Sequence, residues 1–323
     1  MRPSGHVTTD GPKAWIIGRG GLLGRALARR FPQHWSAPAV PWSDPAAATV
    51  ALREQAGQFR RWVGDDPWSV LWAAGAGVVN SDASALSSER ASLLAVVESL
   101  ADWPQATNDA AGVFFLASSA GGLYAGSDPA PFDASSTPVP RSPYGELKLH
   151  QESDARRVLA GRIELIIGRI ANLYGPDQNP SKAQGLVTRL CQAAAHRSPI
   201  NLYVPLNTLR DYVYADDAAA VIAERVRNRL NTDRVRPARG DQEVIVVASG
   251  QSTSVGQMIG VVQGVTHRRV PLATGSSLST RINAQRQVID LRLTPTYPLI
   301  ERTPLATGVR RVFDALVTRP RPA

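Results

Sequence analysis

The 323-residue sequence has little of several residue types on which other proteins depend. It contains one cysteine, Cys191, so no disulfide can form within the chain, and we expect this residue in the core on a helix. Its five histidines are scattered, and none has a second ligand at zinc-like spacing. No run of about 18 or more apolar residues occurs, and residues 1–12 are polar. We therefore expect no bound metal, no membrane span, a flexible tail over residues 1–12 and a cytoplasmic location.

Lysine is also scarce, although the chain is basic. Three of the 36 Lys and Arg residues are lysines, and the formal net charge is +9. Such a charge can indicate nucleic-acid binding. Here the arginines are spread along the chain, and no basic run is interleaved with stacking aromatic residues. We expect no nucleic-acid partner, because small anionic ligands such as nucleotides and sugar diphosphates account for part of the charge.

The order of the predicted elements indicates an α/β fold. Apolar runs at residues 14–17 and 68–74 predict buried strands, and helical patterns follow at residues 45–63 and 86–103. This alternation favours a parallel, doubly wound sheet with helices on both faces. Further elements are predicted at residues 163–168, 186–197, 201–204, 243–248, 255–262 and 305–317. We expect the residues after about 170 to form mainly a smaller lobe, with the substrate cleft between the two parts.

A glycine-rich turn follows the first predicted strand. The sequence GRGGLLG places glycines at 18, 21 and 24, directly before an amphipathic helix. In such a turn the first glycine allows the bend, the second lets a pyrophosphate approach, and the third lets helix and strand pack closely. We expect a dinucleotide cofactor here, held by Gly18, Arg19, Gly21, Leu22, Leu23 and Gly24. Small residues after the strand at 68–74 are expected to approach the same cofactor: Ala73, Ala74 and Gly75.

The acidic residue that usually binds the adenosine ribose is missing. About 20 residues past the glycines, residues 39–42 contain no acid. Asp44 precedes Pro45, which predicts a helix N-cap rather than a ribose ligand. Arg19 lies in the glycine turn, where it is either a ligand of a 2′-phosphate or a solvated loop residue. The balance favours NADP over NAD by a small margin.

The stretch from residue 114 to 148 combines two kinds of polar group. Ser118 and Ser119 lie where an apolar run ends, and Tyr144 and Lys148 are four residues apart in a predicted helix, on one face. A phenol is a weak acid with a reference pKa of about 10, and a nearby ammonium favours the phenolate. The pair can therefore move a proton on or off an alcohol oxygen. The alternative is a surface helix with an ordinary Tyr and Lys, although the retention of a rare lysine favours the first interpretation.

Several motifs occur in a recognisable order: GRGGLLG, LWAAGAG, LASSAGGLY, SPYGELK, RIANLYGP and RDYVYADDAA. Together they resemble the extended short-chain dehydrogenase/reductase family, in its NAD-dependent epimerase/dehydratase branch, which includes UDP-galactose 4-epimerase and nucleotide-sugar 4-ketoreductases. The resemblance implies a Rossmann-like NAD(P)-binding domain over residues 13–170. It implies a substrate lobe mainly over residues 171–323, with some segments returning to the first domain. It also implies a nucleotide-sugar substrate, and homodimers are common in the family.

The resemblance carries roles to matching residues. It implies that Tyr144 is the general acid/base and that Lys148 binds the nicotinamide ribose. It also implies that Asn172 and Arg210 contact the substrate diphosphate, where Arg offers a bidentate fork to phosphate. For Arg210, the alternative is an ion pair with Asp211 or Asp216.

The chain departs from the family pattern at the catalytic hydroxyl. The usual Ser or Thr position, four residues before Tyr124, is Ala120, with Ser119 and Ser118 next to it. Ser119 is therefore the candidate third catalytic residue, and Ser118 and Ser119 are the candidate substrate-binding hydroxyls. The Asp-Glu pair of the 4,6-dehydratases is replaced by Ala-Gly-Gly, so dehydration is not expected.

Two functions follow from these observations. The first is an NAD(P)-dependent epimerase or ketoreductase acting on a nucleotide-activated sugar. The second is a catalytically weak sensor or scaffold protein of the same fold, which the displaced serine and the missing ribose acid motivate. The joint presence of Tyr144, Lys148, Asn172 and Arg210 favours the enzyme.

Overall fold

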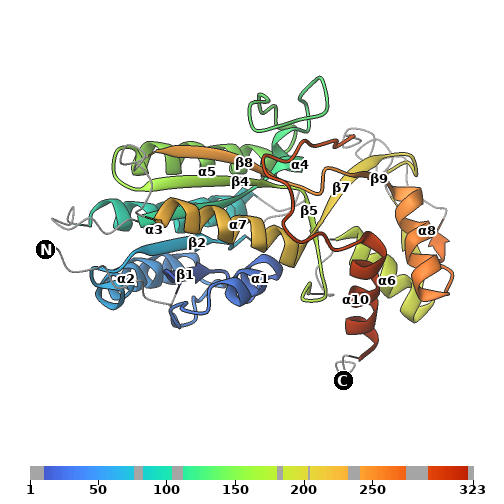
Figure 1. The fold of residues 1–323 in the computed structure, drawn as a ribbon, viewed down its shortest axis with the longest axis horizontal. Helices are drawn as coiled ribbons and strands as arrows, with labels where there is room; N and C mark the ends of the chain where they lie inside the picture. Colours follow the sequence, from blue (N-terminus) through green and yellow to red (C-terminus); the bar gives the residue numbers. More distant parts are fainter. Residues whose placement is uncertain are drawn as a thin grey trace, which may run out of the picture.

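A five-stranded parallel sheet forms the centre of the molecule. The computed structural model describes residues 11–75, 83–103, 112–179, 185–202, 204–231, 241–273 and 290–318. The sheet has the order β1-β2-β3-β4-β8, and every neighbouring pair is parallel (Figure 1). Its strands are β1 (Lys13–Ile17), β2 (Trp68–Trp72), β3 (Gly112–Ser119), β4 (Glu164–Ile170) and β8 (Gln242–Val247). This arrangement confirms the prediction of a Rossmann-like α/β fold.

Helices cover both faces of the sheet because side chains alternate along each strand. In β1, Ala14 and Ile16 face a cluster with α1 (Leu22–Arg30) and α7 (Ala215–Leu230). Their neighbours Trp15 and Ile17 face a second cluster. Its helices are α2 (Pro45–Val63), α3 (Ala83–Ala101) and α5 (Pro143–Leu159). The two apolar clusters enclose the sheet and fix the helices that carry the site.

Helix α2 begins where the sequence predicts it. The carboxylate of Asp44 accepts hydrogen bonds from the backbone N–H groups of Ala46 and Ala47, and Pro45 occupies the first turn. Asp44 is therefore a helix cap, as predicted.

The second strand of a Rossmann-like domain is reduced to one bridge. His34 pairs in parallel with Ala14, on the side of β1 away from β2. The backbone of β1 also contacts this segment through the Trp35 N–H, which donates to the Ala14 carbonyl. The segment therefore reaches the expected place without forming a strand, which explains its weak sequence signal.

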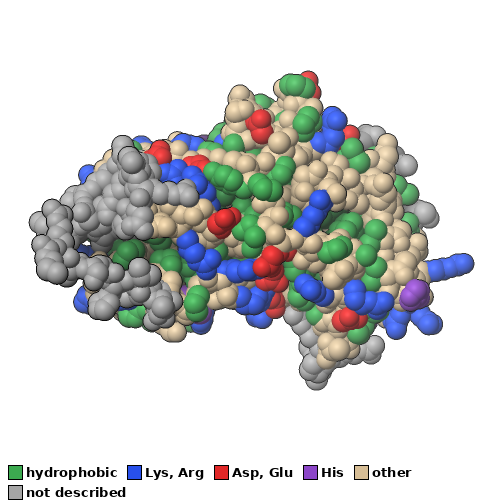
Figure 2. Space-filling model, in the orientation of Figure 1, with side chains coloured by type: hydrophobic (Ala, Val, Ile, Leu, Met, Phe, Trp, Pro, Cys, Tyr) green, Lys and Arg blue, Asp and Glu red, His purple; other side chains and the backbone are tan. Residues whose placement is uncertain are grey.

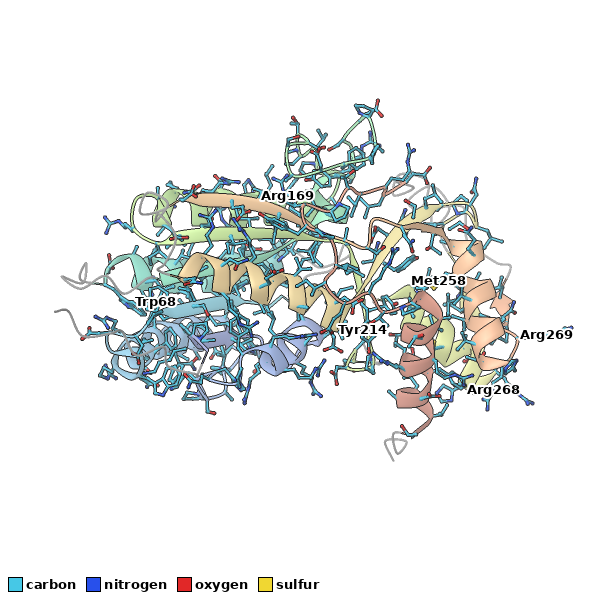
Figure 3. All side chains as sticks on the ribbon, in the orientation of Figure 1. Trp68, Arg169, Tyr214, Met258, Arg268 and Arg269 are labelled. Carbon is cyan, nitrogen blue, oxygen red and sulfur yellow. The ribbon has the colours of Figure 1, made fainter. Side chains whose placement is uncertain are left out.

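A smaller lobe stands beyond the carboxyl ends of the sheet (Figure 1). Its sheet joins β5 (Asn172–Tyr174), β7 (Leu209–Tyr214) and β9 (Ser252–Ser254). Its helices are α6 (Leu186–His196), α8 (Val255–Thr266) and α10 (Leu305–Thr318), packed around side chains such as Met258 and Tyr214 (Figure 3). Cys191 of α6 is buried in this core, which raises the pKa of its thiol to about 12.

One predicted element of the lobe is shorter than expected. The strand β6 is Ile200–Asn201 and pairs with β10 (Leu272–Ala273), whereas Leu202 and Val204 belong to no strand; residue 203 lies outside the described residues. The observed strand therefore begins one residue before the predicted range 201–204, and its described part ends at Asn201.

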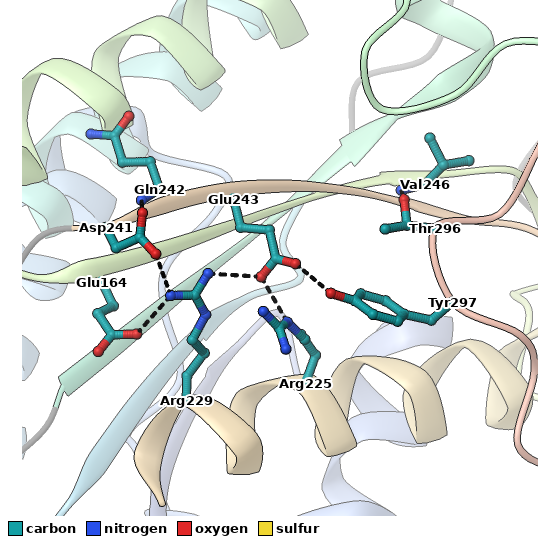
Figure 4. A network of polar contacts seen from close by, with 9 residues as sticks. All are labelled: Glu164, Arg225, Arg229, Asp241, Gln242, Glu243, Val246, Thr296 and Tyr297. Atoms are coloured by element: carbon teal, nitrogen blue, oxygen red, sulfur yellow. Dashed lines mark hydrogen bonds and ion pairs between the residues drawn. The ribbon is translucent and has the colours of Figure 1, made fainter. Parts of the chain in front are cut away.

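Charged contacts attach the late strand β8 to helix α7. Glu243 of β8 accepts hydrogen bonds from Arg225 and Arg229 of α7 and from the Tyr297 hydroxyl (Figure 4). These contacts hold the pKa of Glu243 below its ordinary value although burial opposes this. A strand from beyond residue 170 thus completes the sheet of the first domain.

Positive and negative side chains are interspersed on the face of the molecule drawn in Figure 2. One such contact joins Arg29 to Asp177 and Asp216. Within the part of the chain that the structure describes, no helix is both long enough and apolar enough to span a bilayer.

Candidate active site

A large cavity lies where the parallel strands end and the lobe begins. It has a volume of about 1360 Å³ and is lined by residues of both parts, from Gly18 to Leu291. Pockets for one small ligand usually enclose roughly 300–1,000 Å³. The cavity therefore has room for more than one ligand.

The glycine turn after β1 forms one wall of this cavity. Gly18 has a φ of +86°, and a Cβ on it would lie 2.6 Å from the Cα of Ala74. A Cβ on Gly24 would lie 2.7 Å from the Cα of Arg19 and even closer to the Gly18 carbonyl. Both positions therefore require glycine, the first for its backbone conformation and both for close approach.

The turn leads into the N-terminus of α1 at the cavity wall. Gly21 is the N-cap of this helix, and the first-turn amides and the positive end of the helix dipole favour an anion there. Seven of the predicted cofactor residues line the cavity: Gly18, Gly21, Leu22, Leu23, Ala73, Ala74 and Gly75. Gly24 packs behind the turn. The residues present therefore fit the pyrophosphate of a dinucleotide.

The region expected to hold the adenosine ribose is apolar. Trp42, Pro45 and Ala48 line the cavity there. Arg19 is not one of the lining residues, and its Nη1 donates to Nε2 of His34 over 3.1 Å at the exposed edge of the turn. Arg19 and His34 thus form a polar group at the edge of the glycine turn.

Helix α5 delivers Tyr144 to the cavity wall and buries Lys148 next to it. Its N-cap is Ser142, whose side chain accepts from the Gly145 N–H, and Pro143 occupies its first turn. Gly122 of α4 (Ala120–Leu123) lies under the Tyr144 ring, because a Cβ on Gly122 would be 3.2 Å from Tyr144 Cε1. This close approach fixes the ring at the cavity surface.

The ammonium group of Lys148 is buried beside Tyr144. Its Nζ lies 5.7 Å from the centre of the Tyr144 ring and donates to Oε1 of Glu89 and Oε1 of Gln151, each over 2.9 Å. Burial opposes the charge, but the Tyr144 oxygen and the Glu89 carboxylate outweigh it, so the pKa of Lys148 is raised. The structure thus brings the predicted pair together and keeps its cation charged.

Glu89 is a polar residue of the site that sequence reasoning missed. It lies on α3, and Ala85, Ser88, Glu89 and Ser92 of this helix line the cavity. Their spacing is that of one helix face, and Glu89 is its single acid. The spacing was a signal, but it did not show that Lys148, 59 residues away, would lie opposite.

The two serines at the end of β3 diverge. The Ser119 side chain accepts from the Gly122 N–H and lines the cavity. Ser118 is buried, and its Oγ donates to Oε1 of Glu152 over 2.6 Å. Glu152 also accepts from Arg169, so Ser118 belongs to a buried network rather than to the cavity lining.

The predicted diphosphate ligands come from the lobe. Asn172 and Arg210 both line the cavity, with Asn172 Nδ2 donating to the Asp211 carbonyl and Arg210 Nη1 to the Leu209 carbonyl. Burial lowers the pKa of Arg210 from its ordinary value. The acids considered as its alternative partners have other contacts: Asp216 pairs with Arg29, and Asp211 accepts from the Ser249 N–H.

The fold and cavity define a Rossmann-like α/β protein with a dinucleotide-type cleft. The chain belongs to the NAD-dependent epimerase/dehydratase family, whose family model matches residues 14–234. The match confirms the family resemblance seen in the sequence.

Curated relatives show what the chain is similar to. Over 128 residues it is 33% identical to a dTDP-L-rhamnose 4-epimerase of Burkholderia thailandensis, covering 39% of this chain and 32% of that protein. Over 180 residues it is 24% identical to a dTDP-4-dehydro-6-deoxyglucose reductase of Escherichia coli, covering 55% of this chain and 52% of that protein. The match thus spans 32% and 52% of the length of these relatives.

Solved structures share the fold across nearly the whole chain. The UDP-glucose 4-epimerase of Thermus thermophilus, in complex with NAD, has a TM-score of 0.70 at 17% identity, covering 95% of this chain and 99% of that one. RMD from Pseudomonas aeruginosa, complexed with NADPH, has a TM-score of 0.69 at 16% identity, covering 94% and 98%. At such identities the likeness concerns the fold.

Proposed function

We propose that the protein is an NAD(P)-dependent epimerase or ketoreductase that acts on a nucleotide-activated sugar. One observation carries the proposal. Tyr144 and Lys148 of α5, the glycine turn after β1, and Arg210 of the lobe all line or adjoin one cavity, although they are far apart in the sequence. This combination supplies a proton-transfer group, a dinucleotide wall and a phosphate ligand in one place.

Each residue has a defined part in the reaction. A bound nicotinamide supplies hydride transfer to or from a sugar carbon. Tyr144 gives or takes the proton of the sugar oxygen at that carbon, and Lys148 binds the nicotinamide ribose. Ser119 orients the sugar oxygen from the end of β3. Arg210 and Asn172 hold the diphosphate, which places the sugar beside Tyr144.

The choice of cofactor follows from the ribose region. Residues 39–42 offer no acid to a 2′-hydroxyl, and Arg19 and His34 lie at the edge of the turn. Positive charge at this edge favours a 2′-phosphate, so we favour NADP over NAD by a small margin. Dehydration is not part of the proposal, because α4 has the sequence AGGL and offers no acid or base.

Turnover of nucleotide-sugars by the wild type and Tyr144→Phe tests the proposal. We expect the Phe variant to lose about 10²–10⁴-fold in kcat while still binding the cofactor. Tyr297→Phe, which removes a phenol that donates to Glu243 outside the cavity, is the matched control and should keep wild-type kcat. Equal turnover by the Tyr144 variant would refute the mechanism. Cofactor binding by the wild type without hydride transfer to any nucleotide-sugar would instead identify a binding protein.

A second measurement separates the two reaction types. A cofactor that remains bound through purification, with no net consumption, indicates an epimerase. Consumption of free NADPH with a 4-ketosugar indicates a ketoreductase. Mass spectrometry of the copurified nucleotides detects the first outcome and identifies the retained cofactor as NAD or NADP.

A further inference from the structure

A carboxylate lies against the ammonium group that the proposed reaction uses. Oε1 of Glu89 is 2.9 Å from Nζ of Lys148, and the side chains are 10% and 6% exposed. A buried ion pair of this kind brings little net stability, because both charges must leave water. The position of the pair at the cavity wall therefore points to a role in the site rather than in folding.

The pair is held by more than one contact. Gln151, one helical turn after Lys148, accepts from Lys148 Nζ and donates to Glu89 Oε1 over 3.2 Å. Gly75 closes the other side, since a Cβ on it would lie 3.4 Å from Glu89 Oε1 and 3.7 Å from Lys148 Nζ. The ammonium is thus fixed between α3, α5 and the segment after β2, where the predicted cofactor residues lie.

Other charged groups near Lys148 have their own partners. On α5, Glu152 is paired with Arg169 of β4, and Asp154 is paired with Arg90 of α3. Tyr144, one turn before Lys148, and Glu89 are the groups that favour the ammonium most strongly, with a smaller contribution from Glu152. Without Glu89, burial would still lower the pKa of Lys148, and fewer charged groups would offset that effect.

We propose that Glu89 is a positioning residue for Lys148, which holds the ammonium in its charged form and aims it at the nicotinamide ribose. This inference rests on the proposed function, which gives Lys148 its role. It explains why a carboxylate occupies a helix face otherwise lined by small residues. It also explains how a lysine with so little access to water remains a cation.

The scarcity of lysine makes a direct test practical. The chain contains three lysines, so a sample labelled with lysine enriched in carbon-13 at Cε gives three signals to follow against pH by NMR. Lys148→Arg assigns the signal of Lys148. We expect its midpoint to fall by about one to three pH units in Glu89→Gln, because the amide keeps the shape and loses the charge. Glu89→Asp retains the charge and should restore part of the shift.

Asp154→Asn is the matched control. It removes the carboxylate of a neighbouring contact between the same two helices. In that contact, Nε of Arg90 lies 2.7 Å from Oδ2 of Asp154. The Lys148 midpoint should stay at its wild-type value in this variant. If Glu89→Gln does not fold, Glu89→Ala removes the same charge, and a wild-type midpoint in whichever of these two variants folds overturns the inference.

Cofactor binding gives a second readout that needs no turnover. Trp42 and Trp72 line the cavity, so quenching of tryptophan fluorescence reports binding of NADPH or NADP. In Glu89→Gln we expect at least about tenfold weaker binding above the lowered Lys148 midpoint and a smaller loss below it. Unchanged binding at every pH would contradict the positioning role while leaving the proposed reaction intact. Equal turnover by Tyr144→Phe would have the opposite meaning, since it would refute the reaction while leaving the Lys148 titration valid.

Discussion

Ser118 and Ser119 are adjacent at the end of β3, but their side chains point to opposite sides of the strand. The Ser118 hydroxyl donates to Glu152 over 2.6 Å inside the protein, and the Ser119 side chain lines the cavity. The register explains the difference, because Ser118 lies beside Arg169 of β4, and Arg169 pairs with Glu152. One serine therefore stabilises the fold and the other is available to a substrate.

Replacement of each serine by alanine should separate these roles. For Ser119→Ala we expect kcat/KM to fall roughly 10- to 100-fold, because a hydrogen bond to the sugar oxygen is lost. For Ser118→Ala we expect the free energy of unfolding to fall by about 1–3 kcal/mol, because Glu152 loses a buried donor. Steady-state kinetics and urea unfolding of both variants measure the two effects. A larger loss of kcat/KM in the Ser118 variant than in the Ser119 variant would assign the roles in reverse.

Removal of the Arg169 charge should lower the free energy of unfolding more than Ser118→Ala does. Arg169 is 5% exposed, and its guanidinium donates to both oxygens of Glu152 and to the Tyr124 hydroxyl. Arg169→Met leaves the Glu152 charge buried without its partner, so we expect a loss of about 3–5 kcal/mol in unfolding free energy. The double replacement Arg169→Met, Glu152→Leu should recover much of this loss. If the single and double variants are equally unstable in chemical denaturation, loss of the ion pair does not explain the lower stability.

The glycine turn allows a prediction with a control four residues away. A Cβ on Gly24 would collide with the Gly18 carbonyl and the Arg19 Cα, whereas one on Gly20 meets nothing within 4 Å. Gly24→Ala should therefore lower the unfolding free energy by about 1–3 kcal/mol and weaken cofactor binding, because the turn must shift. Gly20→Ala should keep wild-type stability. Thermal unfolding and cofactor titration test both variants. Equal stability of the two would show that the turn accommodates a Cβ at position 24 without loss of stability.

The sequence predicted best those features that depend on neighbours along the chain. The start of α2 was predicted from Asp44 and Pro45, and its predicted end at residue 63 agrees with the structure, where Gly64 follows with a φ of +61°. The glycine turn and the spacing of Tyr144 and Lys148 are local signals of the same kind. The shared direction of the two side chains follows from the helix repeat alone.

The features that depend on distant contacts were harder to predict. Whether Ser118 or Ser119 faces the cavity depends on Glu152 and Arg169, which become neighbours only when β3, β4 and α5 assemble. The Glu89 contact with Lys148 requires α3 to pack on α5. The segment at the place of the second Rossmann strand pairs with β1 through a single bridge at His34, which is too short an element to detect from sequence.

Arg210 should affect substrate binding without affecting cofactor binding. Lysine at this position keeps the charge but cannot offer a bidentate fork to a diphosphate, so we expect KM for the nucleotide-sugar to rise about tenfold or more in Arg210→Lys. The cofactor Kd should stay within about twofold. Arg292→Lys, at an exposed position, is the control and should match the wild type. A rise in the cofactor Kd equal to the rise in KM would place Arg210 on the other side of the cavity.

Asp154 should make the stability dependent on pH in the acid range. The hydrogen bond from Arg90 holds the pKa of Asp154 below its ordinary value, although burial opposes this. A carboxyl with a lowered folded pKa stabilises the protein above its unfolded pKa of about 3.9, and this contribution is lost as the pH falls through the folded value. Asp154→Asn should thus be less stable than the wild type by about 0.2–1 kcal/mol from pH 7 to 5, since Arg90 is partly exposed.

The difference between Asp154→Asn and the wild type should shrink below about pH 4, because protonation of Asp154 then removes the same charge in the wild type. Arg90→Gln should also lose stability at pH 7 and 5, and the double variant should be about as stable as Asp154→Asn, because Asp154→Asn already removes the contacts of Asp154 with both Arg90 and Arg157. Urea unfolding at pH 7, 5 and 3 measures these differences. A difference that grows as the pH falls would mean that Arg90 does not lower the pKa of Asp154 and that the contact between α3 and α5 has another source.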